Sequence, residues 1–247
     1  MGIFALALAA LATPPGRALV ERLVERAVSS PDFVLDLSGL SGFAPFSFSL
    51  ASVAVSDREG VFVEVEALSV QWSPFRLLVG EIALPHVTAE RVALARRPIL
   101  PPADPANPTE PGGLPPLALG RLEVKRLDLA APVAGQAAAL TLLGSARVSS
   151  DGAIVAEAVA SRVDGPALQA RVEIDNPAGG LGGARVSLAE DANGLLLALI
   201  GQQAGPAYRL DADLKEADGG VAGSVRLTSG ARDRLEGGFR FDRSGEG

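Results

Sequence analysis

The sequence predicts an all-β protein, an elongated, curled antiparallel meander whose apolar face forms a trough. Three observations predict this fold. Apolar and polar residues alternate along many short runs, which is typical of half-buried strands. Gly, Asn, Asp and Pro separate these runs at short intervals, as in hairpin turns. The buried faces must consist mainly of Val, Leu and Ala, because the 247 residues include only nine Phe, one Trp and one Tyr.

The first thirty residues differ from the rest of the chain. Residues 1–13 are uncharged and mainly apolar, and as a helix they would span about 20 Å, less than the roughly 30 Å hydrocarbon core of a bilayer. We interpret them as a truncated membrane anchor, with a signal-peptide core and a buried helix as alternatives. Residues 14–30 begin with a Pro-Pro-Gly break and predict an amphipathic helix that caps the start of a sheet.

The clearest strand pair is a hairpin within a first β-segment, residues 31–97. Two alternating runs flank a Gly-bearing turn at 57–60. A single antiparallel register, which places Val55 opposite Val61, would pair their apolar residues. We expect these residues to line the trough together with apolar residues of later strands. The candidates are Phe46, Phe48, Val53, Val55, Val61, Val63, Val65, Leu68, Val70, Ile82, Leu84, Leu122 and Val124.

Two local features modify this hairpin. The apolar phase slips by one residue near Ala51 and again near Ala67, which predicts a bulge or coil that re-aims the apolar face. Trp72 and Pro74 predict a structural corner, because Pro cannot donate to a strand ladder and restricts the residue before it. Further strands are expected at 81–88 and 90–96.

A Pro-rich stretch divides the β-rich part of the chain. Residues 98–116 contain too many Pro residues for regular structure and predict an extended linker or long loop. A second β-segment, 117–247, resumes the alternation, and its start repeats the pattern of Gly80–Ala89 forty residues later, at Gly120–Leu129. The strands predicted there are 138–148, 153–163, 168–174, 184–188, 195–200, 207–214, 221–227 and 235–241. We expect the meander to continue beyond the segment.

The sequence gives little support for an enzyme. It has no Cys, which excludes thiol catalysis, and a net charge of −7 without clustered Lys and Arg argues against a nucleic-acid partner. It has no nucleophile elbow or phosphate-binding loop. The single histidine, His86, has no ligand partners in the pattern, and we interpret the acidic pairs Asp57 with Glu59 and Asp211 with Asp213 as solvated. We therefore expect no catalytic residue, no cofactor and no metal site.

Several short stretches carry a family resemblance. They are Val53-Ala-Val55-Ser-Asp57, Gly60-Val-Phe62, Leu68-Ser-Val-Gln-Trp-Ser-Pro74, Leu77-Leu78 with Gly80, Val92 to Pro98, and Thr13-Pro-Pro-Gly-Arg17 after the apolar run. In this order they resemble the N-terminal part of the TamB family, the inner-membrane component of the translocation and assembly module, within the AsmA-like group. The strongest part covers residues 1 to 100.

The resemblance implies a function and a location. Members of this family have one inner-membrane helix, a periplasmic β-trough called a β-taco, and a C-terminal domain that meets an outer-membrane barrel partner. We expect a non-enzymatic protein anchored in the inner membrane by a single pass, with its bulk in the periplasm. It would serve outer-membrane biogenesis by carrying phospholipid acyl chains between membranes and supporting outer-membrane protein assembly and secretion.

Two departures from the family pattern matter. The anchor is short and the partner-binding domain is absent, so the chain is expected to be an N-terminal fragment. The alternative function is that of a secreted structural or adhesive β-solenoid protein.

Overall fold

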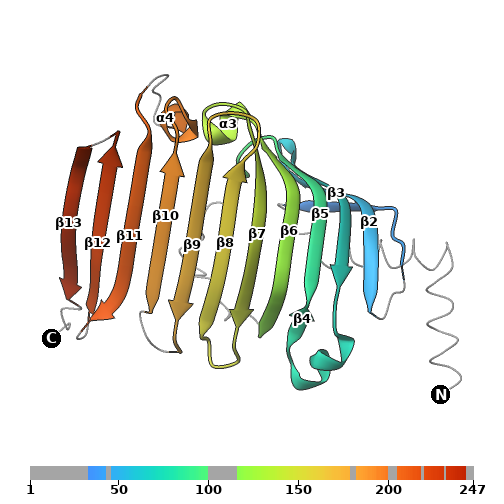
Figure 1. Cartoon of the computed structure of the whole chain (residues 1–247). Helices are drawn as coiled ribbons and strands as arrows, with labels where there is room; N and C mark the ends of the chain where they lie inside the picture. Colours follow the sequence, from blue (N-terminus) through green and yellow to red (C-terminus); the bar gives the residue numbers. More distant parts are fainter. Residues whose placement is uncertain are drawn as a thin grey trace, which may run out of the picture.

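The computed structural model describes residues 33–42, 46–99, 116–178, 182–199, 205–217, 220–230 and 232–242. These residues form one 13-stranded sheet and three short helices (Figure 1). The strands are β1 Val34–Ser38, β2 Ser47–Asp57, β3 Gly60–Gln71, β4 Ile82–Leu84, β5 His86–Leu94, β6 Leu117–Leu129, β7 Ala138–Val148, β8 Ile154–Arg162, β9 Leu168–Asn176, β10 Gly183–Glu190, β11 Tyr208–Ala217, β12 Gly220–Ser229 and β13 Arg232–Asp242. The helices are the 3-10 helix η1 Pro74–Val79 and the α-helices α3 Ala131–Ala134 and α4 Leu195–Leu199.

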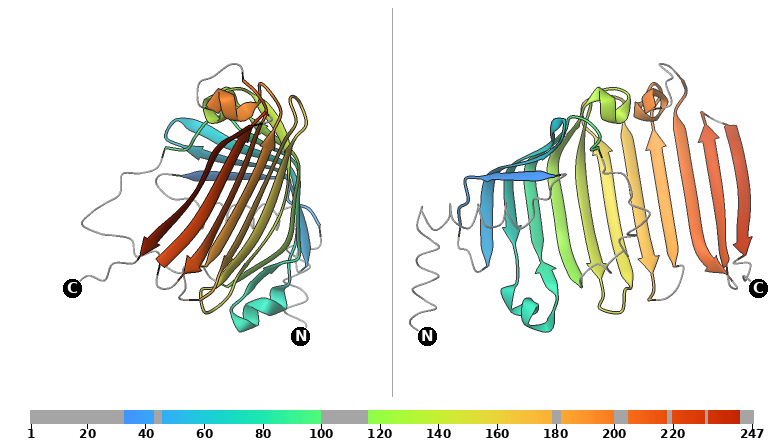
Figure 2. Two further views of the ribbon diagram at one scale, coloured as in Figure 1. Left: turned by 60° about the vertical axis from the view of Figure 1, so that its left-hand side comes forward. Right: turned by 180° about the vertical axis from the view of Figure 1, so that it is seen from behind.

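The sheet confirms the predicted elongated, curled meander. Its strands follow chain order from β1 to β13, apart from the short β4, which lies beside β6. β1 and β13 form the two edges, so the described sheet is open. Seen from behind, β1 crosses in front of its neighbours, so the sheet curls toward its rear face in Figure 1 (Figure 2). The predicted anchor at 1–13, the amphipathic helix at 14–30 and most of the linker at 98–116 lie outside the described residues.

The only parallel pairings in the described sheet join the two predicted β-segments. β4 and β5 both run parallel to β6, whereas the other neighbours are antiparallel. The sheet therefore continues from one segment to the next. Val87 pairs with Leu122, so the strands are offset by 35 positions and not by the forty of the sequence repeat. The break between the predicted strands at 81–88 and 90–96 lies at Pro85, since β4 ends before this residue and β5 begins after it.

The register of the β2–β3 hairpin differs from the prediction. Val55 pairs with Val63 and not with Val61. The reason is the turn, in which only two residues separate the paired Asp57 and Gly60. Gly60 has a φ of 104°, a conformation that favours glycine. The tight turn and an adjacent bulge shift most pairs by two residues. A shift of two leaves those side chains on their predicted face, whereas Val61, on the turn side of the bulge, lies opposite Ser56 and leaves the apolar face.

A crease crosses the sheet at the height of Ala67. This residue has a φ of 49°, which a non-glycine residue seldom adopts. The β2–β3 ladder omits Ala51 and Ala67, and the β6–β7 register shifts between Val124 and Leu127. The predicted phase slip is thus confirmed. Because of it, apolar residues on both sides of the crease point to the same face.

The predicted strand at 195–200 is wrong, since Leu195–Leu199 is the helix α4. The Glu190 carboxylate accepts hydrogen bonds from the backbone amides of Leu195 and Leu196, so it caps the first turn of the helix. Leu and Ala are also strong helix formers. A short apolar run fits a strand or a buried helix equally well.

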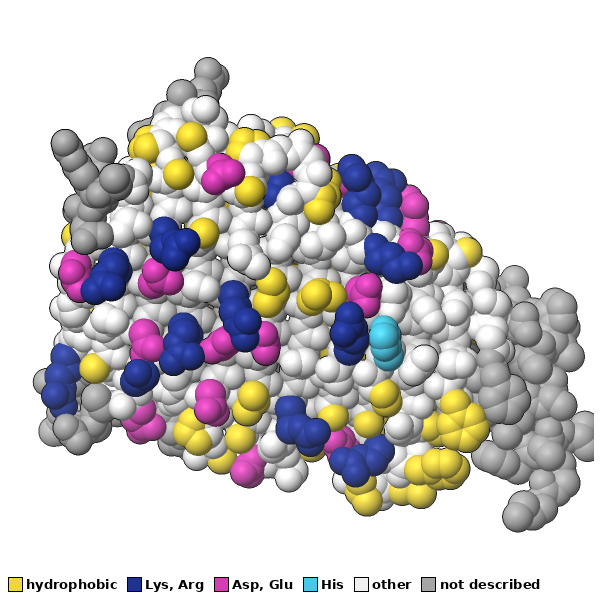
Figure 3. All heavy atoms as spheres, viewed as in Figure 1, with side chains coloured by type: hydrophobic (Ala, Val, Ile, Leu, Met, Phe, Trp, Pro, Cys, Tyr) yellow, Lys and Arg dark blue, Asp and Glu magenta, His cyan; other side chains and the backbone are white. Residues whose placement is uncertain are grey.

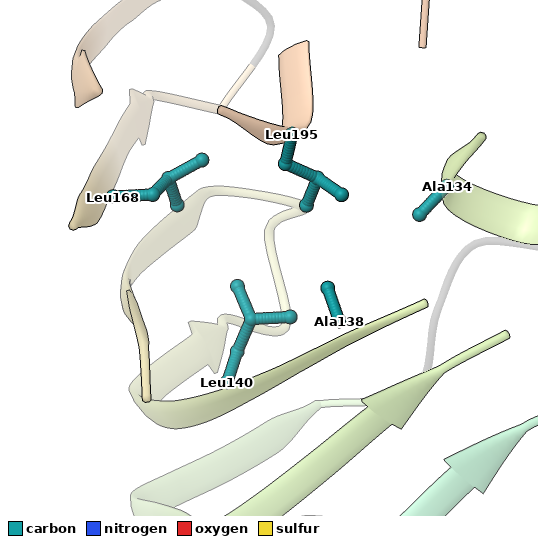
Figure 4. Close-up of a cluster of buried hydrophobic side chains, with 5 residues drawn as sticks. All are labelled: Ala134, Ala138, Leu140, Leu168 and Leu195. Atoms are coloured by element: carbon teal, nitrogen blue, oxygen red, sulfur yellow. The ribbon is translucent and has the colours of Figure 1, made fainter. Parts of the chain in front are cut away.

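The main cluster of buried side chains lies under α3 and α4 (Figure 4). It consists of Ala134 from α3, Leu195 from α4, and Ala138, Leu140 and Leu168 from the strands β7 and β9. Both helices lie at the same end of the strands in Figure 1. They cover one margin of the sheet and leave most of its width without a second layer of described helices.

Candidate functional site: the apolar face of the sheet

Residues that pair directly across neighbouring strands lie on the same face of a sheet. One row of such residues crosses the sheet from β2 to β13, and every member is apolar. This apolar row is Leu50, Leu68, Ala89, Val124, Leu142, Ala160, Ala170, Leu188, Leu210, Leu227 and Leu235. At about 4.8 Å between strands, it extends for about 50 Å.

A second row runs beside the first and is also free of polar side chains. Its members are Val70, Val87, Leu122, Gly144, Ala158, Val172, Val186, Ala212, Val225 and Gly237. Small residues are frequent in its middle, where Gly144 and Ala158 are paired. The two rows define one continuous surface, which we call the apolar face.

The opposite face of the sheet is charged. Arg171 on β9 pairs with Glu157 at 2.8 Å and with Glu173 at 2.7 Å. Arg185 on β10 then joins Glu173 at 2.9 Å to Asp213 on β11 at 3.2 Å. Figure 3 shows Lys, Arg, Asp and Glu interspersed across the width of this face. Across the middle of the sheet the side chains therefore divide into an apolar face and a face rich in charge, although Arg162 lies opposite Leu140 at the margin of the apolar face and Leu143 lies exposed on the charged one.

Most of the predicted trough-lining residues share the apolar face. The structure places eleven of them there: Phe48, Val53, Val55, Val63, Val65, Leu68, Val70, Ile82, Leu84, Leu122 and Val124. Val61 lies beside the hairpin turn and is 42% exposed. Phe46 precedes β2 and is 47% exposed, with its ring centroid 6.1 Å from that of Phe75.

Burial on the apolar face is incomplete. Val53, Val70 and Val124 are buried, whereas Phe48, Val63 and Leu122 are half-buried. A packed core of a two-layer protein would bury nearly all such residues. The part of the chain that the structure describes therefore offers a broad apolar surface that a ligand could cover.

No known family matches this chain. Comparison with protein-family models, with curated proteins and with solved structures gave no match. The resemblance to the TamB family stays a prediction based on the short stretches quoted above.

The predicted corner lies at one end of the apolar face. β3 ends at Gln71, and the backbone amide of Trp72 donates to the carbonyl of Phe46 at 2.9 Å. Pro74 is the first residue of η1, so the chain leaves the ladder where Pro can no longer donate a hydrogen bond.

The interpretation of Asp57 as a solvated turn residue is wrong. Its side chain is 1% exposed and forms an ion pair with Arg96. The hydrogen bond from Arg96 is the main reason that the pKa of Asp57 lies well below its ordinary value. Arg96 also lies over the ring of Phe62, 5.8 Å from the centroid. Sequence alternation could not reveal this contact, because it joins the β2–β3 turn to the segment after β5.

The other predicted acidic pair is accounted for by charge pairing. Asp213 lies 3.2 Å from Lys215 and 3.2 Å from Arg185, and Lys215 is the main cause of its lowered pKa. Asp211 lies opposite Arg226 in the β11–β12 ladder. Both aspartates therefore belong to the charged face of the sheet.

A groove of about 690 Å³ lies on the charged face, near the ends of β8 to β11 opposite to α4. Its lining includes Glu157, Glu173, Arg185, Asp213 and Lys215, and these side chains pair with oppositely charged neighbours. The groove therefore lacks the concentrated charge of one sign that would draw an ionic ligand.

The described residues suggest no metal or membrane-spanning element. Across the described ranges, no group of three or more His, Cys, Asp or Glu could hold a metal ion. His86 is the first residue of β5 and pairs with Gln71. Within the same ranges, no helix is both long and apolar enough to cross a membrane.

Proposed function

We propose that this protein is a non-enzymatic lipid carrier whose apolar face shields phospholipid acyl chains from water. The observation that carries the proposal is the apolar row, which runs from β2 to β13 without a polar interruption. Enzymes concentrate polar groups in a pocket, whereas this surface is long, continuous and chemically uniform. Such a surface suits an extended apolar ligand.

The free energy of lipid exposure supports the proposal. Acyl chains favour an apolar environment by about 0.8 kcal/mol per methylene, so exposing two chains with about thirty methylenes costs about 24 kcal/mol. A surface that covers half of the methylenes would lower this barrier by about 12 kcal/mol. The rate of lipid transfer would then rise by many orders of magnitude. The phosphate headgroup would stay in water at the margin of the sheet.

The curl and the division into faces fit the same role. The sheet bends toward its apolar face (Figure 2), so acyl chains there would meet side chains from more than one direction. The charged face keeps the opposite side soluble. The helices α3 and α4 cover one margin, which leaves the rest of the apolar face for ligand.

The cellular role follows from the resemblance. We infer that the chain belongs to an inner-membrane-anchored periplasmic protein of outer-membrane biogenesis, with residues 1–13 as part of its anchor. It would carry phospholipid between the membranes and support outer-membrane protein assembly and secretion. Contact with an outer-membrane barrel partner would belong to the C-terminal domain that the resemblance implies. The alternative, a secreted β-solenoid, finds less support, because consecutive strands pair as hairpins and do not form stacked coils.

A crosslinking experiment tests the proposal with a matched control. Leu142 lies on the apolar face and Leu143 on the charged face of the same strand, where it is 43% exposed. A photoreactive residue is placed at either position in the full chain in cells, and crosslinked lipid is measured by mass spectrometry. We expect lipid adducts at position 142 and none at position 143. Equal labelling, or no adduct together with no copurified lipid, would contradict the proposal.

A further inference from the structure

The 3-10 helix η1 carries a group of highly exposed apolar side chains. Phe75 is 71% exposed, Leu78 84% and Val79 73%, and Leu77 is 47% exposed. No residue of η1 is buried. In Figure 1, η1 projects beyond the lower ends of the neighbouring strands, and Figure 3 shows an apolar patch at that margin. We call these four side chains the apolar tip.

The base of the apolar tip is fixed by polar contacts. The amide of Ser73 donates to the carbonyl of Ala83 at 2.9 Å, and the amide of Glu81 donates to the carbonyl of Arg76 at 3.1 Å. The side chains of Arg76 and Glu81 form an ion pair. The helix closes at Gly80, whose φ of 75° suits glycine. The loop is thus anchored at both ends while its apolar side chains point outward.

The apolar tip lies next to one end of the apolar face. The ring of Phe75 is 6.1 Å from that of Phe46. Phe46 is held beside Trp72 by a backbone hydrogen bond of 2.9 Å, and two residues further along Phe48 pairs with Val70 on the apolar face. The apolar surface therefore extends from the sheet onto η1 through Phe46.

We propose that the apolar tip inserts into the interfacial layer of a lipid bilayer and so places one end of the apolar face beside the membrane. The insertion of the apolar tip does not depend on the proposed function. The placement of a lipid-binding face beside the membrane does rest on it. Exposed aromatic and aliphatic side chains on a projecting element favour the boundary between headgroups and acyl chains.

The size of the apolar tip favours a bilayer over a protein partner. A stable protein interface buries about 800 Å² on each side. Even at about 150 Å² for each side chain, the four residues would supply about 600 Å². A bilayer needs no complementary pocket, so a small convex tip is sufficient.

The charges at the base also suit a membrane. Two basic side chains, Arg76 and Arg147, share the single carboxylate of Glu81, with Arg147 at 3.9 Å. Both are more than half exposed. These three side chains carry one net positive charge, which would lie at the depth of anionic headgroups once the apolar tip is inserted.

The single tryptophan of the chain provides a built-in probe. Trp72 lies two residues before η1 and is half-buried. The full chain is mixed with vesicles of phosphatidylcholine and phosphatidylglycerol that carry bromine near the headgroup end of their acyl chains, and Trp fluorescence is recorded. We expect quenching by these vesicles and weaker quenching by vesicles brominated near the bilayer centre. The double variant Phe75→Ser, Leu78→Ser should need at least about tenfold more lipid for half-maximal quenching.

Control variants keep the experiment decisive. Leu143→Ser removes an exposed apolar side chain from the charged face, and its quenching should equal that of the parent chain. Because Phe75 and Leu78 are exposed, the double variant should keep the Trp emission spectrum of the parent chain without vesicles. Absence of quenching while the chain floats with vesicles would overturn the proposal, as would quenching that the double variant retains. If quenching disappears when a copurifying protein is removed from the sample, the apolar tip binds that protein and not the bilayer. This outcome would also overturn the proposal.

The same samples separate this proposal from the proposed function. Lipid that copurifies with the chain reports on the apolar face, and the double variant should retain it. Quenching without copurified lipid would support the apolar tip and contradict lipid carriage. Copurified lipid without quenching would contradict the apolar tip alone.

Discussion

The carboxylate of Asp57 is held by the guanidinium of Arg96, thirty-nine positions further along the chain. Arg96 Nη1 donates to Asp57 Oδ2 at 2.8 Å, and the backbone amide of Ile99 donates to the same oxygen at 2.9 Å. Arg96 also donates to the carbonyl of Gly60 at 2.7 Å. This contact fastens the β2–β3 turn to the segment that follows β5, at one corner of the sheet.

Acid should weaken this contact. Arg96 lowers the pKa of Asp57 in the folded state, so the ion pair adds stability above the unfolded pKa, about 3.9, and this stability is lost as the pH falls below that value. We expect Asp57→Asn to lower the urea midpoint at pH 7 and to have a clearly smaller effect at pH 2, since the stability is lost gradually as the pH falls from the unfolded pKa toward the much lower folded pKa. Asp36→Asn, at an exposed position on β1, serves as the control. An equal effect of Asp57→Asn at both pH values would show that the charge of Asp57 does not contribute to the stability of the fold.

The cluster under α3 and α4 should dominate the stability of the sheet. Leu168 is 7% exposed and packs in the cluster with Leu140 and Leu195. Leu168→Ala would remove about 2 to 4 kcal/mol from the free energy of unfolding, because it leaves a cavity between the strands and the helix. Leu142→Ala, at a half-buried position on the same face, should lower the free energy of unfolding by less than Leu168→Ala does. Urea denaturation of both variants checks this order, and a larger loss at Leu142 would contradict it.

Alternation predicted the strands well where a strand has one polar and one apolar face. The predicted run at 138–148 coincides with β7, and most later strands agree within a few residues. The same pattern placed eleven of the thirteen proposed lining residues on one face. The reason is physical, since side chains of a strand alternate between faces with a period of two.

Features set by turns and distant contacts could not be predicted in this way. The hairpin register depends on the conformation of Gly60, and α4 depends on the cap from Glu190. The burial of Asp57 depends on Arg96, which is remote in the sequence. The apolar tip is not predicted by strand alternation, because it lies between the corner at Trp72 and Pro74 and the next strand, and only the structure gives the exposure of its side chains. A projecting run of Phe, Leu and Val beside Pro74 was the available signal.

The cap that Glu190 provides to α4 should make a measurable contribution to the free energy of unfolding. Glu190 is 3% exposed, and its carboxylate accepts a hydrogen bond of 3.0 Å from the amide of Leu196. Glu190→Ala would leave these amides without an acceptor and should cost about 1 to 2 kcal/mol of stability. Glu236→Ala removes an exposed ion pair with Arg226 and should cost at most about 1 kcal/mol. Chemical denaturation of the two variants compares them, and equal losses would argue against a special role of the cap.

A charge on the apolar face should expel lipid, whereas the same charge on the other face should not. Leu142→Asp places a carboxylate in the middle of the apolar row, and Leu143→Asp places one beside Glu123 on the charged face. Burying a carboxylate against acyl chains costs several kcal/mol, so we expect several-fold less copurified phospholipid for Leu142→Asp. Leu143→Asp should copurify with about as much lipid as the parent chain, measured per mole of folded protein by mass spectrometry. Circular dichroism of both variants checks that the sheet is still folded. If both variants retain lipid equally, the acyl chains do not lie on the apolar row.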